Sequence, residues 1–161
     1  MKVLLLSCNT GEGHNSAARA IKEQFDARDI PCVIENALGF ASERFSEYIC
    51  NTYVKMTLHT PKLFGWGYKV GRDIASPKYK SPVYLANKLY AEALRKYIQE
   101  NGFDTVIMTH VFPAEAMTAL RRAGKCVARL YAVSTDYSCC PFFEEIEADR
   151  YFIPHASLIP Q

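Results

Sequence analysis

Residues 10–18, TGEGHNSAA, combine residue types that suit a ligand-binding loop. Gly11 and Gly13 allow a backbone to turn sharply and to approach a ligand closely. The helix expected next offers free N–H groups and a positive dipole end, which suit a phosphate. His14 adds a group that can exchange a proton near neutral pH. The loop therefore predicts a site for a phosphate-bearing ligand beside a base, although the same residues would also make a simple tight turn.

Four ionisable residues each lie just past a strand-like segment. They are His14, His110, Asp136 and His155. In a parallel sheet, ligands bind beyond the carboxyl ends of the strands. A histidine beside a carboxylate can be held in one tautomer and made a better base, as the deprotonation of an alcohol requires. We therefore expect these residues to share one edge of a sheet.

Short apolar segments alternate with helical patterns at both ends of the chain. The predicted strands are 2–7, 31–35, 104–109, 126–133 and 151–153, and the predicted helices beside them are 15–28 and 113–122. Strands that alternate with helices build parallel sheets. The pattern predicts an α/β fold, a Rossmann-like doubly wound parallel sheet, in a single domain over residues 1–161.

The middle of the chain, about residues 42–101, reads as a helical insertion in that domain. Ser42 is suited to cap a helix that runs to about residue 58, and Pro82 to begin one that ends at residues 101–102. The second helix is amphipathic, and its predicted apolar side carries Leu85, Leu89, Leu94, Tyr97 and Ile98.

The insertion contains a basic, aromatic segment, residues 55–80. It has six basic residues and one acid, a charge of +5, so the rest of this +2 chain carries −3. Such a mixture suits an anionic membrane surface, where rings lie at headgroup depth. The predicted membrane-docking residues are Lys62, Phe64, Trp66, Tyr68, Lys69 and Arg72. The alternative is a loop whose rings cover the core. With a net charge of only +2 and no nucleic-acid module, we expect no nucleic-acid partner.

Several other chemistries lack their motifs. The six cysteines include no C-x-x-C pair and the four histidines are scattered, so we expect no metal site and a reduced, cytoplasmic protein. A G-x-S-x-G elbow and a P-loop are absent. Gly11-x-Gly13-x-x-Ser16, with Glu35 at the end of the second strand, partly matches a dinucleotide site. An NAD(P)-binding oxidoreductase therefore stays open.

These segments together resemble the amino-terminal domain of the monogalactosyldiacylglycerol synthases and the bacterial processive diacylglycerol glucosyltransferases. The resemblance rests on TGEGHNSAA at 10–18, THVF at 109–112, VSTDY at 133–137 and DRYFIPH at 149–155, with a looser match at 61–65. Glu12 stands where many members have a third glycine.

The resemblance implies an inverting glycosyltransferase of the GT-B type, built from two Rossmann-like halves. The first half would hold a diacylglycerol acceptor and the second a UDP-sugar, with no prosthetic group. His14 would be the base, and Asp136 would either orient it or be the base itself. The other implied substrate-binding residues are Gly11 and Gly13 near the diphosphate, Asn15 at the helix start, His110, Tyr137 and His155.

The length of 161 residues corresponds to one such half. We therefore expect an acceptor-binding domain for glycolipid synthesis, without the UDP-sugar domain, inactive alone and peripheral at the inner face of the cell membrane. A non-catalytic module that binds membrane lipid is a further alternative.

Overall fold

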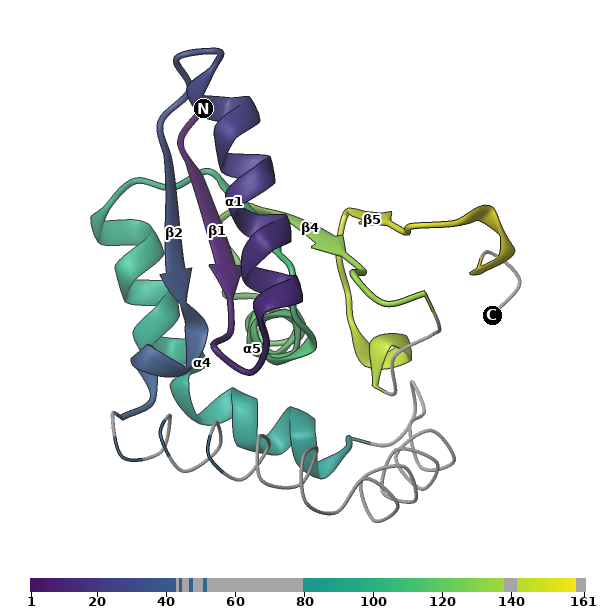
Figure 1. The fold of residues 1–161 in the computed structure, drawn as a ribbon. Helices are drawn as coiled ribbons and strands as arrows, with labels where there is room; N and C mark the ends of the chain where they lie inside the picture. Colours follow the sequence, from purple (N-terminus) through teal and green to yellow (C-terminus); the bar gives the residue numbers. More distant parts are fainter. Residues whose placement is uncertain (43, 45–46, 48–50, 52–79, 138–141, 159–161) are drawn as a thin grey trace.

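Five parallel strands form the centre of the fold (Figure 1). They are β1 (Val3–Ser7), β2 (Cys32–Asn36), β3 (Thr105–Met108), β4 (Arg129–Val133) and β5 (Arg150–Phe152), in the spatial order β2-β1-β3-β4-β5. The structure is a computed structural model that describes residues 1–42, 44, 47, 51, 80–137 and 142–158. The predicted Rossmann-like α/β sheet is confirmed.

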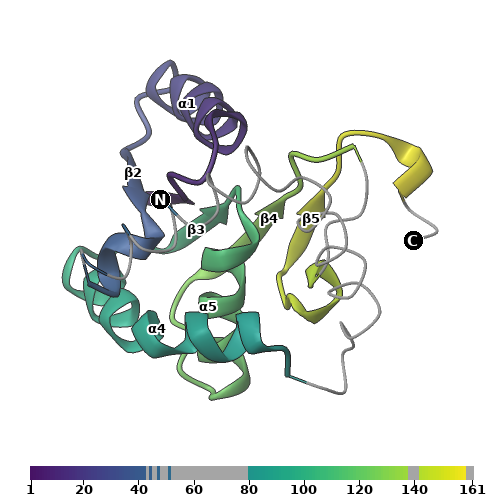
Figure 2. The same ribbon diagram turned by 60° about the horizontal axis from the view of Figure 1, so that its bottom comes forward.

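Helices cover the sheet on both faces. Figure 2 shows α1 (Glu12–Asp26) on one side, and α4 (Pro82–Glu100) and α5 (Val111–Arg122) on the other. Every residue of β1 is buried: Val3 and Leu5 pack in the cluster beside α1, and Leu4 and Leu6 pack in the cluster with α4 and α5. Strand residues alternate between faces, so a continuous apolar strand suits a sheet covered on both sides.

The order of the strands places a switch point between β1 and β3. The chain passes from β1 through α1 to β2, and then crosses through α4 to β3 on the other side of β1. Ligands of open α/β sheets bind at the carboxyl ends of strands where the winding reverses in this way. The loops after β1 and β3 therefore border the most favourable ligand position of the fold.

Two helices begin earlier than the sequence indicated. α1 begins at Glu12, not near residue 15, with Gly11 as an extended N-cap whose φ is 176°. α5 begins at Val111, not residue 113, because Nδ1 of His110 accepts a hydrogen bond from the Phe112 N–H and so caps the helix. Both shifts bring a histidine into or directly before the first turn of a helix.

α4 spans the predicted residues, but the predicted apolar side is partly wrong. Leu94 and Ile98 are buried, whereas Leu85 and Leu89 are 52% and 80% exposed. The buried face of the helix carries residues that are spaced by three and four positions: Tyr84, Asn87, Ala91, Leu94 and Ile98. That spacing follows one face of an α-helix, whereas Leu85 and Leu89 lie beside it.

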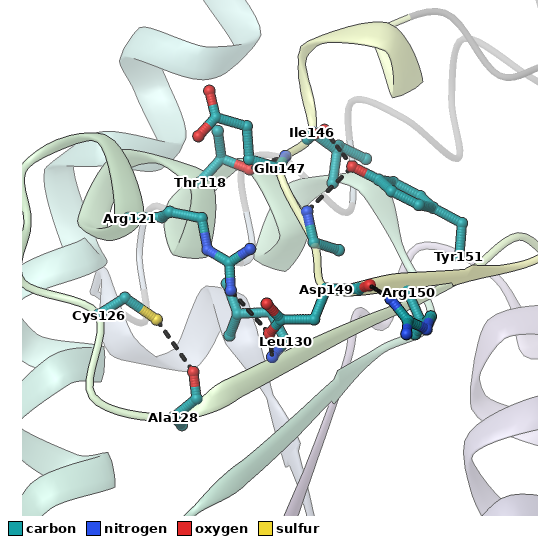
Figure 3. Close-up of polar contacts among 11 residues, drawn as sticks. Thr118, Arg121, Cys126, Ala128, Leu130, Ile146, Glu147, Asp149, Arg150 and Tyr151 are labelled. Carbon is teal, nitrogen blue, oxygen red and sulfur yellow. Dashed lines mark hydrogen bonds and ion pairs between the residues drawn. The ribbon is translucent and has the colours of Figure 1, made fainter.

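The connection from β4 to β5 is held to α5 by polar contacts, shown in Figure 3. Asp149 accepts from the Arg121 guanidinium and from the Leu130 N–H, both at 2.7 Å. Thr118 Oγ1 accepts from the Glu147 N–H at 2.9 Å. The described part of the connection contains one short 3-10 helix, η2 (Phe143–Glu145). Two others lie elsewhere: η1 (Ala37–Phe40) follows β2, and η3 (Ala156–Leu158) follows β5. These contacts hold the edge strand β5 in place. Among the described residues, no α-helix connects β4 to β5.

The predicted helix after Ser42 and the basic segment 55–80 lie almost wholly outside the described residues. The membrane-docking residues proposed there stay predictions. Of the helices that the structure does describe, none combines the length and the apolar character needed to cross a bilayer.

Candidate functional site

His14 lies in the first turn of α1, at the carboxyl edge of the sheet, and contacts the ends of two other strands. Its Nδ1 lies 2.9 Å from the carbonyl oxygen of Thr109, which follows β3. The same atom lies 2.7 Å from Oγ1 of Thr135, which follows β4. The loops after β1, β3 and β4 therefore meet at one imidazole nitrogen.

These contacts decide which nitrogen of His14 carries the hydrogen in the neutral ring. A carbonyl oxygen can only accept, so the short contact with Thr109 requires a hydrogen on Nδ1. Nε2 then holds the lone pair, and among the described residues nothing hydrogen-bonds to it. The neutral ring of His14 therefore presents its lone pair at Nε2.

His110 lies beside His14 and has the opposite hydrogen arrangement. Its Nδ1 accepts from the Phe112 N–H at 3.1 Å, so Nε2 carries the hydrogen and donates to Oγ1 of Thr10 at 3.0 Å. The two imidazoles meet edge to face, with ring centroids 4.4 Å apart. Burial, together with the nearby His14, lowers the pKa of His110 to about 3. His110 is therefore a neutral neighbour of His14.

Asn15 connects the start of α1 to β1 and to the loop between them. Its Oδ1 accepts from the Ser7 hydroxyl at 2.7 Å, and its Nδ2 donates to Oδ1 of Asn9 at 3.2 Å. Both ends of the amide are thus used within the protein. The contacts hold the loop that carries Gly11 and set the position of the helix on which His14 lies.

Gly11 and Gly13 are exposed, and neither is required by the backbone. Gly11 is extended and Gly13 is helical. A Cβ at Gly13 would meet nothing within 4 Å, and one at Gly11 would only reach ordinary contact with His14. A glycine in a helix costs stability relative to alanine. What these two glycines provide is open space along the first turn of α1, where backbone N–H groups have no side-chain cap.

The structure places the other predicted site residues at the same edge without joining them to His14. Asp136 follows Thr135 and is exposed, and it is Thr135, not the carboxylate, that contacts His14. Tyr137 is 86% exposed. His155 follows β5, is exposed, and pairs with Ser157. The roles of Asp136, Tyr137 and His155 stay predictions.

Three threonines complete the histidine cluster, and sequence reasoning did not single them out: Thr10, Thr109 and Thr135. All three directly precede residues that were predicted, and two of those residues are ionisable, since Thr109 precedes His110 and Thr135 precedes Asp136. A threonine next to an ionisable residue at a strand end is the signal that could have found them.

The acid that a dinucleotide site would need is engaged elsewhere. Oε1 of Glu35, in β2, accepts from the hydroxyl of Tyr97 at 2.8 Å. Burial, followed by this hydrogen bond, raises the pKa of the Tyr97 hydroxyl. Glu35 therefore links β2 to α4. Within the part of the chain that the structure describes, no group of three or more His, Cys, Asp or Glu side chains is placed to hold a metal ion.

Curated relatives share this chain's sequence at low identity over most of its length. It is 26% identical over 164 residues to a processive diacylglycerol beta-glucosyltransferase of Bacillus cereus (strain B4264), and 24% identical over 162 residues to the protein of that name in Bacillus cytotoxicus. Each match covers 94% of this chain and 38% of the relative, so the chain spans well under half the length of these relatives. No solved structure gives a significant match.

The family comparison covers nearly the whole chain. The model of the family described as monogalactosyldiacylglycerol (MGDG) synthase matches residues 14–161, a span that begins at His14 and includes the strands that hold it. The chain therefore belongs to the MGDG synthase family.

Proposed function

We propose that this chain is the acceptor-binding part of an inverting, UDP-sugar-dependent glycosyltransferase that glycosylates diacylglycerol. The observation that carries the proposal is the orientation of His14, whose Nδ1 is occupied and whose Nε2 is left as the base. Membership of the MGDG synthase family and the names of the relatives support this substrate class. The engagement of Glu35 by Tyr97 gives no support to the NAD(P) alternative.

The reaction needs one proton acceptor beside the attacking hydroxyl. Nε2 of His14 takes the proton from the acceptor alcohol, and the alcohol oxygen attacks the anomeric carbon of the sugar as UDP leaves from the opposite face. One displacement of this kind inverts the anomeric configuration. The Nδ1–H of His14 donates both before and after proton transfer, so its contacts serve the neutral ring and the imidazolium alike.

The first turn of α1 is suited to the diphosphate of the departing UDP. Its N–H groups carry no side-chain cap, and the space beside Gly13 is open. A helix N-terminus stabilises negative charge. Charge develops on the diphosphate as the glycosidic bond breaks, so stabilisation there lowers the barrier. In a GT-B arrangement, the second Rossmann-like half would hold the rest of the UDP-sugar.

The acceptor is a membrane lipid, and the basic segment 55–80 supports a peripheral position at an anionic, cytoplasmic membrane face. This segment lies outside the described residues except for Lys80, and its support for a membrane position comes from its charge of +5 and its aromatic residues. Basic residues near anionic headgroups each add about 1 kcal/mol to membrane attachment.

Sugar transfer by the full-length gene product tests the proposal. Transfer from UDP-glucose or UDP-galactose to diacylglycerol would be measured in mixed vesicles containing phosphatidylglycerol. His14→Ala should lower the rate by about a hundredfold or more, the usual contribution of a positioned base, and leave vesicle binding unchanged. Glu23→Ala, an exposed change on the same helix, is the matched control.

Near-normal transfer by His14→Ala would remove His14 as the base. Absence of transfer by the unaltered protein with either sugar, together with a binding shift on addition of NADH, would favour the oxidoreductase instead.

A further inference from the structure

We propose that Thr135 is a positioning residue, which fixes the ring of His14 so that Nε2 remains the base. The inference rests on the proposed function only in naming Nε2 as the base. The hydrogen position and ring orientation belong to this chain and can be measured without any transfer reaction.

A single hydrogen bond would leave the imidazole loosely held. The terminal torsion of a histidine is broad, so the ring can swing or turn over between two similar orientations. In the ring-flipped orientation, a carbon would face Thr109 and Nδ1 would lose its acceptor. A second acceptor from a different strand removes that freedom, and Oγ1 of Thr135 lies at 2.7 Å, which is closer than the Thr109 carbonyl at 2.9 Å.

The two acceptors of the Nδ1–H differ in what they can specify. The Thr109 carbonyl belongs to the backbone, can only accept, and thereby places the hydrogen on Nδ1. The Thr135 hydroxyl can donate or accept, and beside that carbonyl it must accept. Were it to donate instead, the lone pairs of Nδ1 and the Thr109 oxygen would face each other. Thr135 is thus the one described side chain that hydrogen-bonds this nitrogen and that mutation can remove.

The contact also links a third strand to the site. His14 follows β1 and Thr109 follows β3, which are paired with each other, whereas Thr135 follows β4. Thr135 is half-buried, so its hydroxyl contacts the ring at the border of the open edge. The neutral His110 packs edge-on against the same ring at 4.4 Å. Together these groups hold His14 in one plane before any substrate arrives, the preorganisation that efficient proton transfer needs.

Nitrogen-15 NMR of the imidazole rings tests the positioning role on the 161-residue chain. At pH 8.5, the unaltered chain should show His14 with a protonated Nδ1 and an unprotonated Nε2. In Thr135→Val, which keeps the shape and removes the hydroxyl, the Nδ1 hydrogen should exchange with water about tenfold faster, and a second tautomer should become visible. Thr135→Ser should restore the original signals, because it keeps the acceptor oxygen.

Thr105→Val is the matched control, since Thr105 lies at the other end of β3 and donates to Asp104. It should leave the signals of His14 unchanged. A second readout is transfer by the full-length gene product, in which Thr135→Val should lower kcat about tenfold with KM unchanged and Thr135→Ser should recover it.

Three results would overturn the proposal: a His14 that carries its hydrogen on Nε2 in the unaltered chain, a folded Thr135→Val with unchanged signals, or a Thr135→Ser that behaves like Thr135→Val. The first of these needs no variant. A protein that shows the expected tautomer but transfers no sugar would refute the proposed function and leave the positioning role intact.

Discussion

Two pairs of ionisable residues at helix α5 differ in how their protons are specified. At its start, His110 packs against His14, and their hydrogen bonds define the position of each ring hydrogen. About one and a half turns later, Glu115 lies close enough to Glu145 to feel its charge. Both glutamates are fully buried, and neither oxygen of Glu115 has a hydrogen-bond partner in the part of the chain that the structure describes.

Burial favours the neutral form of His110 and of Glu115, with opposite consequences for their pKa values. It lowers the pKa of His110 to about 3 and, with the charge of Glu145, raises the pKa of Glu115 to about 8. Glu145 has one anchored oxygen, which accepts from the Ser81 N–H at the start of α4 at 3.1 Å. Burial and a neighbouring charge thus set the protonation state of these two groups, whereas a complete set of hydrogen bonds decides which atom carries the proton.

Two effects on stability are expected to be the largest and of similar size, and the first comes from His110. Between about pH 3 and the ordinary histidine pKa near 6.5, the unfolded chain binds a proton that the folded chain does not. The free energy of unfolding should therefore fall by about 1.4 kcal/mol per pH unit as the pH drops through this range. His110→Asn keeps a helix-capping side chain that does not titrate. Urea unfolding of this variant should show a free energy of unfolding that depends less on pH below about pH 6.5. At pH 7 the variant should be less stable than the unaltered chain, because the hydrogen bond to Thr10 is lost. His155→Asn, at an exposed histidine, serves as the control, and a slope equal to that of the unaltered chain in His110→Asn would contradict the prediction.

Glu115 should produce the opposite slope on the alkaline side. From about pH 4.5 to about pH 8 the folded chain retains a proton that the unfolded chain releases, so the free energy of unfolding should fall as the pH rises. Glu115→Gln should remove this dependence, again about 1.4 kcal/mol per pH unit. Unfolding by urea at pH 5 and pH 8.5 measures it, with the exposed Glu144→Gln as control. If Glu115→Gln has the same dependence as the unaltered chain, the carboxyl of Glu115 is already ionised at low pH.

Two glycines, Gly13 in α1 and Gly124 after α5, give the smallest expected effects. Gly13→Ala, beside the histidines, should raise the free energy of unfolding by about 0.5–1 kcal/mol, because its backbone is helical and the Cβ position is empty. Gly124→Ala, after α5, should lower it by about 1–2 kcal/mol, because Gly124 has a φ of +67°.

Thermal unfolding of the two variants measures this difference, and in the full-length gene product Gly13→Ala should still weaken UDP binding. A Gly13→Ala variant that is more stable and binds UDP normally would show that the open space at α1 is not used by the diphosphate.

Local sequence patterns were sufficient to predict the strands and the shared edge. β1 is a run of apolar residues followed by glycines, and such a segment has few alternatives to a buried parallel strand. His14, His110 and Asp136 follow separate strands, and the parallel arrangement then places them at one edge. The start of α5 was less predictable, because histidine is an uncommon N-cap and its capping contact depends on the ring orientation.

The sequence by itself determined the type of fold, the strand ends that carry ionisable residues, and the family resemblance. Only the tertiary structure decided that Thr109 and Thr135, which lie 95 and 121 residues from His14, contact its Nδ1 and leave the lone pair on Nε2. It also decided that α4 buries Tyr84 and not Leu85, and that Glu115 has no hydrogen-bond partner among the described residues. The physical reason is that periodicity reports which face of an element is apolar, whereas a proton's position depends on atoms brought within 3 Å by the order and register of the strands.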